Sequence, residues 1–228
     1  MNAAKPIKSF IKARFPRAAA AYRDARQVWS KPSLATVFSE IYQTNAWQDA
    51  ESVSGRGSTL ARTTAIMAQL PLLLQDLNVK TLLDAGCGDF NWMRHVALTD
   101  IDYIGIDVVP ELIARNRERY ENEHATFAVM DITRDRLPVA DAILCRECFI
   151  HLSLRNIQAA LKNFQNGSAT YLLCTTHPAV SANTDCPDGG WRSLNLQLPP
   201  FDFPEPIRLL VEDEELGKCL GVWRLKDL

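Results

Sequence analysis

Residues 82–89 read Leu-Leu-Asp-Ala-Gly-Cys-Gly-Asp, and this stretch decides the fold. An apolar segment that begins at residue 79 ends in a Gly-x-Gly turn, formed by Gly86 and Gly88. Glycines in such a turn can adopt positive φ and let a ligand lie against the backbone. Doubly wound sheets bind nucleotides at this point, where the first strand gives way to the first helix. The stretch therefore predicts an α/β nucleotide-binding domain.

Strand and helix patterns alternate along the rest of the chain. Beyond residues 79–85, strands are expected at 102–107, 126–130, 140–145 and 169–175, with helices at 60–77, 110–120 and 153–164. This alternation predicts a parallel sheet with right-handed crossovers. Two later strands, at 207–211 and 219–225, flank a short acidic turn and are expected to close the sheet as an antiparallel pair. The long Pro- and Gly-rich loop at 181–206 is of a length that usually serves function.

The N-terminal part differs in composition from the rest. Residues 1–50 are expected to form a basic helical extension, with prolines dividing it into short helices, and residues 51–228 the main domain. Residues 1–31 hold eight Lys or Arg against one acid, which leaves 17 basic and 26 acidic residues in the remainder. This basic arm is either a solvated helix or a contact for an acidic partner or anionic surface.

Composition excludes several classes of protein. A net charge of -2 gives no general attraction to nucleic acid. No apolar run reaches the roughly 18 residues that cross a bilayer, and no secretory signal is present. The six scattered cysteines are typical of a reducing compartment, so a cytoplasmic location is expected. Cys145 and Cys148 form a C-x-x-C pair, but without a second pair no metal site is predicted.

Charge around the glycine turn separates two classes of cofactor. Asp84 and Asp89 flank the turn, and Asn91 replaces the third glycine of a dinucleotide-binding motif. These carboxylates would repel a pyrophosphate, whereas they would attract the ammonium and sulfonium groups of S-adenosylmethionine. The turn therefore favours S-adenosylmethionine over NAD.

Acidic residues also end the next two strands. Asp107 follows Gly88 by 19 residues, close to the roughly 20 expected of an acid that hydrogen-bonds ribose hydroxyls. Asp131 and Ile132 follow the third strand, where a carboxylate and a backbone N–H can meet an adenine ring. Their order along successive strand ends supports one nucleoside site.

These motifs, together with the Cys-Arg-Glu-Cys-Phe-Ile-His-Leu segment at 145–152, resemble class I S-adenosylmethionine-dependent methyltransferases over roughly residues 79–175. The resemblance implies a doubly wound, mostly parallel seven-stranded sheet whose last strand is antiparallel. It also implies site residues: Asp84, Gly86 and Gly88 for the methionine part, Asp107 for the ribose, Asp131 and Ile132 for the adenine, and Arg146 and Glu147 beside the transferring methyl. Family members that methylate nucleic-acid bases carry Asn-Pro-Pro-Tyr-like residues where this chain has Arg-Glu-Cys-Phe, so a nucleic-acid acceptor is not expected.

Two histidines are candidates for a general base. His151 lies four residues past Glu147, which would orient it if both began one helix, and His177 follows the fifth strand. A capping or packing role for His151 stays open. The loop at 54–59 is either a flexible hinge between arm and domain or a lid with Arg56 on the cofactor or an anionic acceptor, and its glycines before a helix start favour the lid. Trp92 is a candidate pocket wall, and Trp191 a candidate acceptor contact.

Three functions remain on the sequence alone. The leading one is methyl transfer to a small-molecule acceptor, at a hydroxyl of a sugar or secondary metabolite. A protein methyltransferase whose basic arm docks an acidic partner is the second. A catalytically silent cofactor-binding subunit is the third, and Glu147 and His151 favour catalysis over it.

Overall fold

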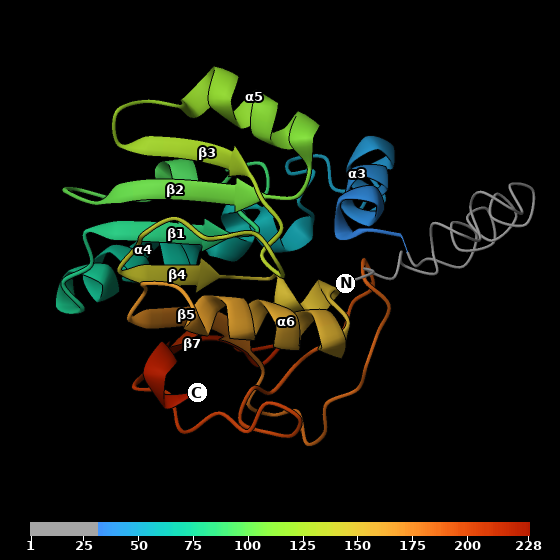
Figure 1. Ribbon diagram of the computed structural model, residues 1–228, viewed down its shortest axis with the longest axis vertical. Coiled ribbons are helices and arrows are strands. Elements are labelled where there is room, and N and C mark those ends of the chain that lie inside the picture. The colour runs from blue at the N-terminus through green and yellow to red at the C-terminus, as the bar shows by residue number, and fades with distance from the viewer. Residues whose placement is uncertain (1–31) are drawn as a thin grey trace, which may run out of the picture. The chain divides into compact units, whose positions relative to one another are not determined.

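The computed structural model describes residues 32–228, so the expectations for residues 1–31 lie outside the described part. Contacts group Leu34–Leu228 into one compact unit, which thus begins before residue 50. Seven strands of this unit form one sheet in the order β3-β2-β1-β4-β5-β7-β6 (Figure 1). Their bounds are β1 Thr81–Ala85, β2 Asp102–Asp107, β3 Ala125–Val129, β4 Ala142–Cys145, β5 Tyr171–Thr176, β6 Arg208–Asp213 and β7 Lys218–Arg224.

Strand directions confirm the predicted fold class. β1 pairs in parallel with β2 and β4, and β2–β3 and β4–β5 are also parallel pairs. β7 runs antiparallel to both β5 and β6. The sheet is therefore doubly wound and mostly parallel, with an antiparallel last strand, and each predicted strand lies within two residues of its observed bounds.

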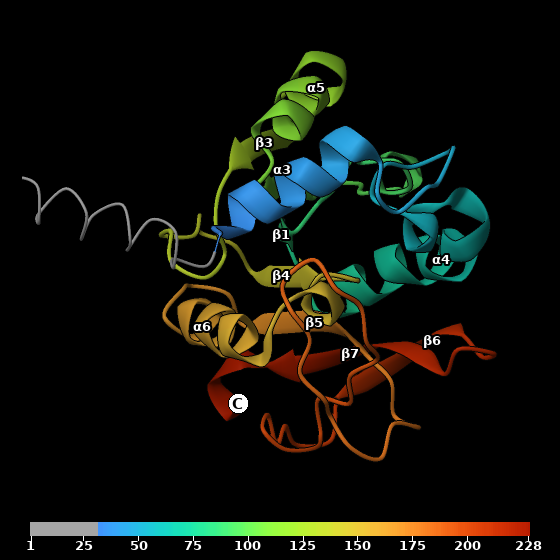
Figure 2. The same ribbon diagram turned by 90° about the vertical axis from the view of Figure 1, so that its right-hand side faces the viewer.

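Helices cover both faces of the sheet. α4 (Leu60–Asp76) and α5 (Pro110–Tyr120) pack on one face, and α6 (Leu154–Gln165) packs on the other (Figure 2). Short 3-10 turns η1 (Arg56–Ser58), η2 (Met93–His95), η3 (Phe149–His151) and η4 (Leu225–Asp227) complete the elements. Each face has its own apolar core, so the strands between them are largely buried.

α3 (Leu34–Thr44) lies beyond the carboxyl ends of the strands (Figure 1). Leu34, Phe38, Ile41 and Tyr42 recur at i, i+4, i+7 and i+8, which gives the helix one apolar stripe. Leu34 is buried, while Phe38 and Tyr42 pack against the core on the α4 side. α3 is therefore part of the domain and covers the end of the sheet where a ligand would bind.

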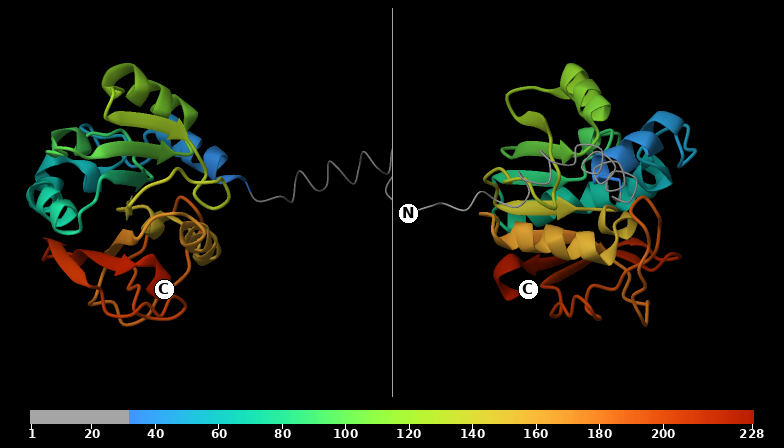
Figure 3. Two further views of the ribbon diagram at one scale, coloured as in Figure 1. Left: turned by 60° about the vertical axis from the view of Figure 1, so that its left-hand side comes forward. Right: turned by 45° about the vertical axis from the view of Figure 1, so that its right-hand side comes forward.

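The long segment between β5 and β6 packs against the domain. Leu194, Leu196 and Phe203 are buried, and Trp223 Nε1 donates to the Pro204 carbonyl at 2.8 Å. Part of this segment, in orange in Figure 3, runs up toward α3. A Cβ at Gly189 would lie 2.8 Å from both Ile41 Cδ1 and Val37 Cγ1, so the two segments touch.

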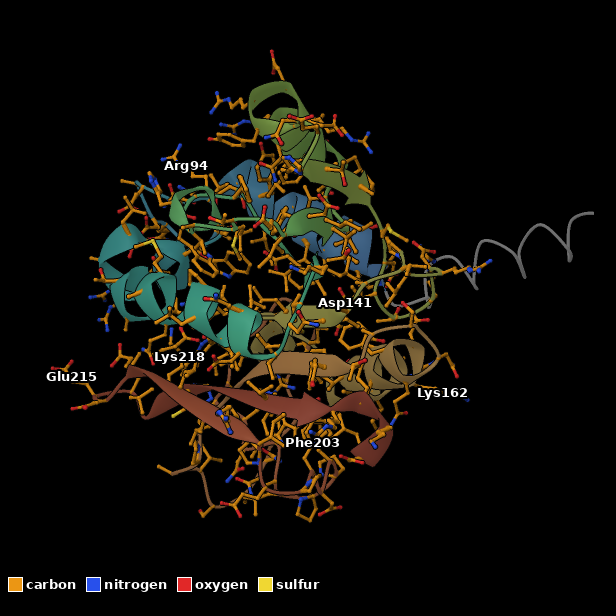
Figure 4. All side chains as sticks on the ribbon, turned by 90° about the vertical axis from the view of Figure 1, so that its left-hand side faces the viewer. Arg94, Asp141, Lys162, Phe203, Glu215 and Lys218 are labelled. Carbon is orange, nitrogen blue, oxygen red and sulfur yellow. The ribbon has the colours of Figure 1, made fainter. Side chains whose placement is uncertain are left out.

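Hydrogen bonds between a side chain and the backbone hold the opposite end of the sheet. Figure 4 views it from the amino ends of the strands, where the Asp141 carboxylate accepts the N–H groups of Lys80 and Thr81 at 2.8 and 2.9 Å. Glu215 projects from the β6–β7 turn in the same view.

Between residues 32 and 228, no helix combines the length and apolar character that crossing a bilayer requires.

Candidate active site

A pocket opens at the carboxyl ends of β1, β2 and β4, with about 970 Å³ of space between its walls, mouth included. Its walls come from α3 and the following residues, the 53–58 loop, the glycine turn, the ends of β2 and β3, and the segment after β4. The predicted residues that line it are Asp84, Gly86, Gly88, Asp107, Ile132, Arg146, Glu147 and His151. Arg56, Asp131 and His177 are not among its lining residues.

The glycine turn leaves no room for side chains. Gly86 has φ +87° and Gly88 φ +57°, both in the left-handed region. A Cβ on Gly86 would lie 3.0 Å from Cys148 Sγ, and one on Gly88 would overlap the Ser54 hydroxyl. The turn therefore requires glycine for conformation and for space, and its bare backbone faces the pocket.

Asp84 is a buried carboxyl at the end of β1. Tyr103 donates its phenolic hydroxyl to Asp84 Oδ2 at 2.7 Å. Burial raises the pKa of Asp84 to about 7, although the Tyr103 hydrogen bond and nearby Arg146 oppose the rise. A cationic ligand group beside it would favour the ionised form.

Asp107 organises the turn as well as lining the pocket. Its Oδ2 accepts from the Gly88 N–H at 3.2 Å, and its Oδ1 accepts from the Val109 N–H at 3.1 Å. Burial raises the pKa of Asp107, and these hydrogen bonds limit the rise. Each carboxylate oxygen has a further lone pair with which to accept from a ligand hydroxyl.

The end of β3 contributes apolar walls. Met130 and Ile132 line the pocket on either side of Asp131. The Asp131 carboxylate is bonded locally, since Oδ1 accepts from the Thr133 N–H and hydroxyl and Oδ2 pairs with Arg134 at 3.1 Å. The structure thus places Ile132 at the pocket and directs the Asp131 carboxylate elsewhere.

The loop at 51–59 is fastened across the glycine turn. The Asp89 carboxylate accepts from the Ser52 hydroxyl and the Val53 N–H, and the Asp89 N–H donates to Ser54 Oγ at 2.8 Å. Asp89 is therefore occupied by this loop, contrary to its expected attraction for a cofactor cation. Ser54 and Ser58 line the pocket, while the Arg56 side chain is exposed.

Arg146, directly after β4, belongs to a network of charged side chains. It pairs with Glu212 of β6 at 2.7 Å, donates to the Gly57 carbonyl at 3.0 Å, and lies 5.0 Å from the Trp92 ring centroid. Lys218, the first residue of β7 (Figure 4), reaches Glu212 at 3.4 Å and Glu147 Oε1 at 3.6 Å. Two cations and two carboxylates therefore balance one another behind the pocket.

Glu147 belongs to the same network of charged side chains and, like Arg146, lines the pocket. Its backbone has φ +55°, and its N–H donates to the Thr175 hydroxyl at 2.8 Å. Its Oε1 is buried and accepts no hydrogen bond from residues 32–228. The Lys218 ammonium, 3.6 Å away, compensates the charge of this buried oxygen.

His151 lies in η3 against the pocket and is held from two sides. Its Nδ1 is 2.7 Å from the Gly190 carbonyl, and its ring lies 4.8 Å from the Trp47 ring centroid. Burial lowers the pKa of His151 below the usual value of 6.5. The expectation that Glu147 orients it from the same helix face was wrong, because Glu147 precedes η3 and α6 begins only at Leu154.

Of the remaining candidates, His177 and Trp191 lie away from the pocket walls, and Trp92 lines the pocket. His177 is buried, with Nδ1 3.3 Å from both backbone atoms, N and O, of Leu194. Trp191, expected at the acceptor, is 62% exposed and does not line the pocket. Trp92 is buried and does line it.

Sequence reasoning missed several wall residues, namely Phe38, Tyr42, Trp47, Met130 and Cys148. For α3 a signal existed, because its apolar stripe indicates a helix that packs on the domain. No local pattern distinguishes Trp47 or Cys148. Cys148 is a neighbour of Gly86 only because β1 and β4 are adjacent strands.

Comparison with known proteins agrees with this geometry. Residues 82–167 match the family model of a methyltransferase domain. Human N-acetylserotonin methyltransferase with bound S-adenosylmethionine has a TM-score of 0.59 at 10% identity, over 94% of this chain and 68% of that one. The methyltransferase domain of bacterial CtHen1 has a TM-score of 0.54 at 18% identity, over 73% of this chain and 100% of that one. N-methyltransferase NodS from Bradyrhizobium japonicum WM9 has a TM-score of 0.53 at 18% identity, over 72% of this chain and 96% of that one. At these identities the structures establish the fold, and no curated protein matches the chain.

The fold and the bare glycine turn define a nucleotide-binding α/β enzyme domain. Within that class, residues 82–167 match a methyltransferase domain, and the cofactor that the sequence motifs indicate for it is S-adenosylmethionine. The pocket fits that cofactor: it offers a cradle without side chains, a buried carboxyl at Asp84 for a cation, and Asp107 for ribose hydroxyls.

Proposed function

We propose that the enzyme methylates a hydroxyl group of a small molecule, with His151 as the general base. The observation that carries this proposal is the hydrogen bond between His151 Nδ1 and the Gly190 carbonyl. A carbonyl can only accept, so Nδ1 carries the proton and Nε2 of the neutral ring has a free lone pair. Nε2 has no hydrogen-bond partner among residues 32–228 and is not fully buried.

The state of His151 suits a base near neutral pH. Because burial lowers its pKa, the ring is neutral at pH 7 and able to take a proton. S-adenosylmethionine supplies an electrophilic methyl group when it is bound. His151 would remove the proton of the acceptor hydroxyl as that oxygen attacks the methyl group. The Glu147 carboxylate, which lines the pocket, would accept a hydrogen bond from a second donor group of the acceptor.

The walls near His151 indicate the body of the acceptor. Leu34, Phe38, Ile41, Trp47 and Trp92 line this pocket. Aromatic and aliphatic walls with a few fixed polar groups are typical of sites for small organic ligands. An acceptor with an apolar or aromatic surface next to its hydroxyl fits these walls better than a flexible charged peptide does.

The cofactor site supports the remaining roles. Asp84, Gly86 and Gly88 would hold the methionine part, Asp107 the ribose, and Met130 and Ile132 the adenine faces. Arg146 would support the site indirectly, because its guanidinium is already bonded to Glu212 and to the Gly57 carbonyl. Much of methyl transfer depends on such positioning of donor and acceptor.

The test uses S-adenosylmethionine with a labelled methyl group and a panel of phenols, alcohols and sugars. We expect label in a small product that resists mild alkali, as an ether does and a methyl ester does not. His151→Ala should lower kcat roughly 10²–10⁴-fold, while His124→Ala, an exposed control at the far end of the sheet, should not. Label transferred only to protein, or a His151→Ala kcat within about threefold of wild type, would contradict the proposal.

A further inference from the structure

The hydrogen bond that fixes His151 comes from an irregular segment, residues 184–192. A loop carbonyl can orient a base only if the loop itself is held in place. The contacts of this segment converge on the residues on either side of His151, in η3 and at the start of α6. These contacts reach the backbone of the residues next to His151, so they fix the position of the histidine directly.

Arg192 makes the most concentrated of these contacts. It is 7% exposed, and its guanidinium donates to three carbonyl groups. Nη1 donates to Phe149 at 2.7 Å, Nη2 to Leu152, and Nε to Thr184 at 3.3 Å. Its own N–H donates to the Ile150 carbonyl at 3.2 Å. A single side chain thus ties both ends of η3 to the segment that carries Gly190.

The acidic residues of the segment secure its other end. Asp188 Oδ1 accepts from the Ser153 N–H at 2.7 Å, and Oδ2 accepts from Asn156 Nδ2 at 2.9 Å. Asp185 accepts from the Leu154 N–H at 2.8 Å. These carboxylates cap the first turn of α6, where backbone N–H groups lack partners within the helix.

Gly189 and Gly190 bring the segment within reach of the ring. The Gly189 N–H donates to the His151 carbonyl at 2.8 Å, next to the bond between Gly190 O and His151 Nδ1. Gly189 has φ +83°, and its Cα faces Val37 and Ile41 of α3 so closely that a Cβ would not fit. The segment is therefore pressed between α3 and η3.

We infer that Arg192 is a positioning residue that selects the Nδ1–H tautomer of His151, leaving Nε2 as the proton-accepting nitrogen. Which nitrogen of a neutral imidazole is protonated depends on the hydrogen bond that the other atom makes. Without the Gly190 carbonyl, the ring reverts to the Nε2–H form that predominates in water. In that form the nitrogen assigned to the acceptor already carries a proton.

This inference rests on the proposed function for its catalytic meaning, but the tautomer can be measured without any acceptor. Long-range ¹H–¹⁵N correlation spectra of the full chain, recorded with S-adenosylmethionine at pH 7.5, report which ring nitrogen of each of the four histidines is protonated. His151→Ala assigns the His151 signals. We expect a protonated Nδ1 and an unprotonated Nε2 in the wild type.

Arg192→Gln should shift His151 mainly to the Nε2–H form while leaving the affinity for S-adenosylmethionine within threefold, because Arg192 does not line the pocket. Gly189→Ala, which acts from the α3 side, should do the same and serves if Arg192→Gln fails to fold. Trp191→Ala is the matched control: the residue lies between Gly190 and Arg192 and is 62% exposed, and removal of its ring should leave the tautomer unchanged.

An Nε2–H tautomer in the wild type would overturn the inference, as would an unchanged Nδ1–H tautomer in a folded Arg192→Gln variant or, where that variant does not fold, in Gly189→Ala. A different result would show that the proposed function is wrong while the inference about Arg192 holds. In that case Arg192→Gln changes the tautomer, but His151→Ala retains the kcat of the wild type.

Discussion

The phenolic hydroxyl of Tyr103 donates a 2.7 Å hydrogen bond to the Asp84 carboxylate, and both side chains are buried. The two residues come from neighbouring strands: Asp84 lies in β1 opposite Gly105, and Tyr103 lies in β2 opposite Leu82. Burial raises the pKa of Asp84 to about 7, even with Arg146 nearby. The free enzyme therefore holds a carboxyl that is ready to ionise when a cationic ligand arrives.

This relationship predicts pH-dependent binding of S-adenosylmethionine. Below pH 7 Asp84 is mostly protonated in the free enzyme, and the bound cation favours its ionised form, so binding must release a proton. Affinity should fall as the pH decreases from 7 toward 5, by up to about tenfold per pH unit. Calorimetry at several pH values, in buffers of different ionisation enthalpy, measures both the affinity and the number of protons released on binding. Asp84→Asn should bind more weakly with a nearly flat profile, and a wild-type profile that is equally flat would contradict this role.

Asp107→Ala should weaken cofactor binding by about 1.5–3 kcal/mol, because a charge-assisted contact to the ribose is lost. The same carboxylate holds the Gly88 N–H, so the effect includes loosening of the turn. Asp102→Ala, at the other end of β2 and exposed, is the control that should bind as the wild type does. A folded Asp107→Ala variant with unchanged affinity would reduce Asp107 to a turn residue.

Glu147 should recognise positive charge at the position of the transferring methyl. Sinefungin, which carries an ammonium group there, should bind more tightly than S-adenosylhomocysteine, which has neither methyl nor charge. Glu147→Gln should reduce that preference by about 1.5–3 kcal/mol, since a hydrogen bond to a charged group is lost. Competition binding measures the difference. If Glu147→Gln keeps the full preference, the carboxylate does not face the methyl.

Removal of residues 1–31 should leave S-adenosylmethionine binding intact, because the pocket walls begin at Leu34. Removal of residues 1–47 should weaken binding at least about tenfold, because α3 and Trp47 form part of the pocket. Binding by each truncated protein can be followed by calorimetry after a check of its thermal unfolding. Loss of binding in the shorter truncation would mean that the basic arm contributes to the site.

Local patterns were enough to predict the sheet and the cofactor turn. Asp84 and Asp107 lie at the carboxyl ends of β1 and β2, and Gly86 and Gly88 follow β1. The carboxyl ends of parallel strands meet at one edge of a sheet. Asp89 and Asp131 carry the same signal but are bonded to neighbouring loops, a difference that depends on Ser52 and Thr133 side chains in three dimensions.

The acceptor side could be predicted only in part. His151 was found from its place after β4, but the partner that orients it, Gly190, is 39 residues away in an irregular segment. Glu147 was assigned that task on the assumption of a continuous helix, and the left-handed backbone at Glu147 prevents one. Contacts of this kind depend on tertiary packing and leave no periodic pattern in the sequence.

Titration calorimetry with S-adenosylmethionine and with NAD tests most directly the claim that Asp84 and the bare glycine turn form a methyl-donor site. We expect micromolar binding of S-adenosylmethionine and of its demethylated product, and no binding of NAD, because the carboxylates repel a pyrophosphate. Tight binding of NAD with no response to S-adenosylmethionine would contradict the assignment.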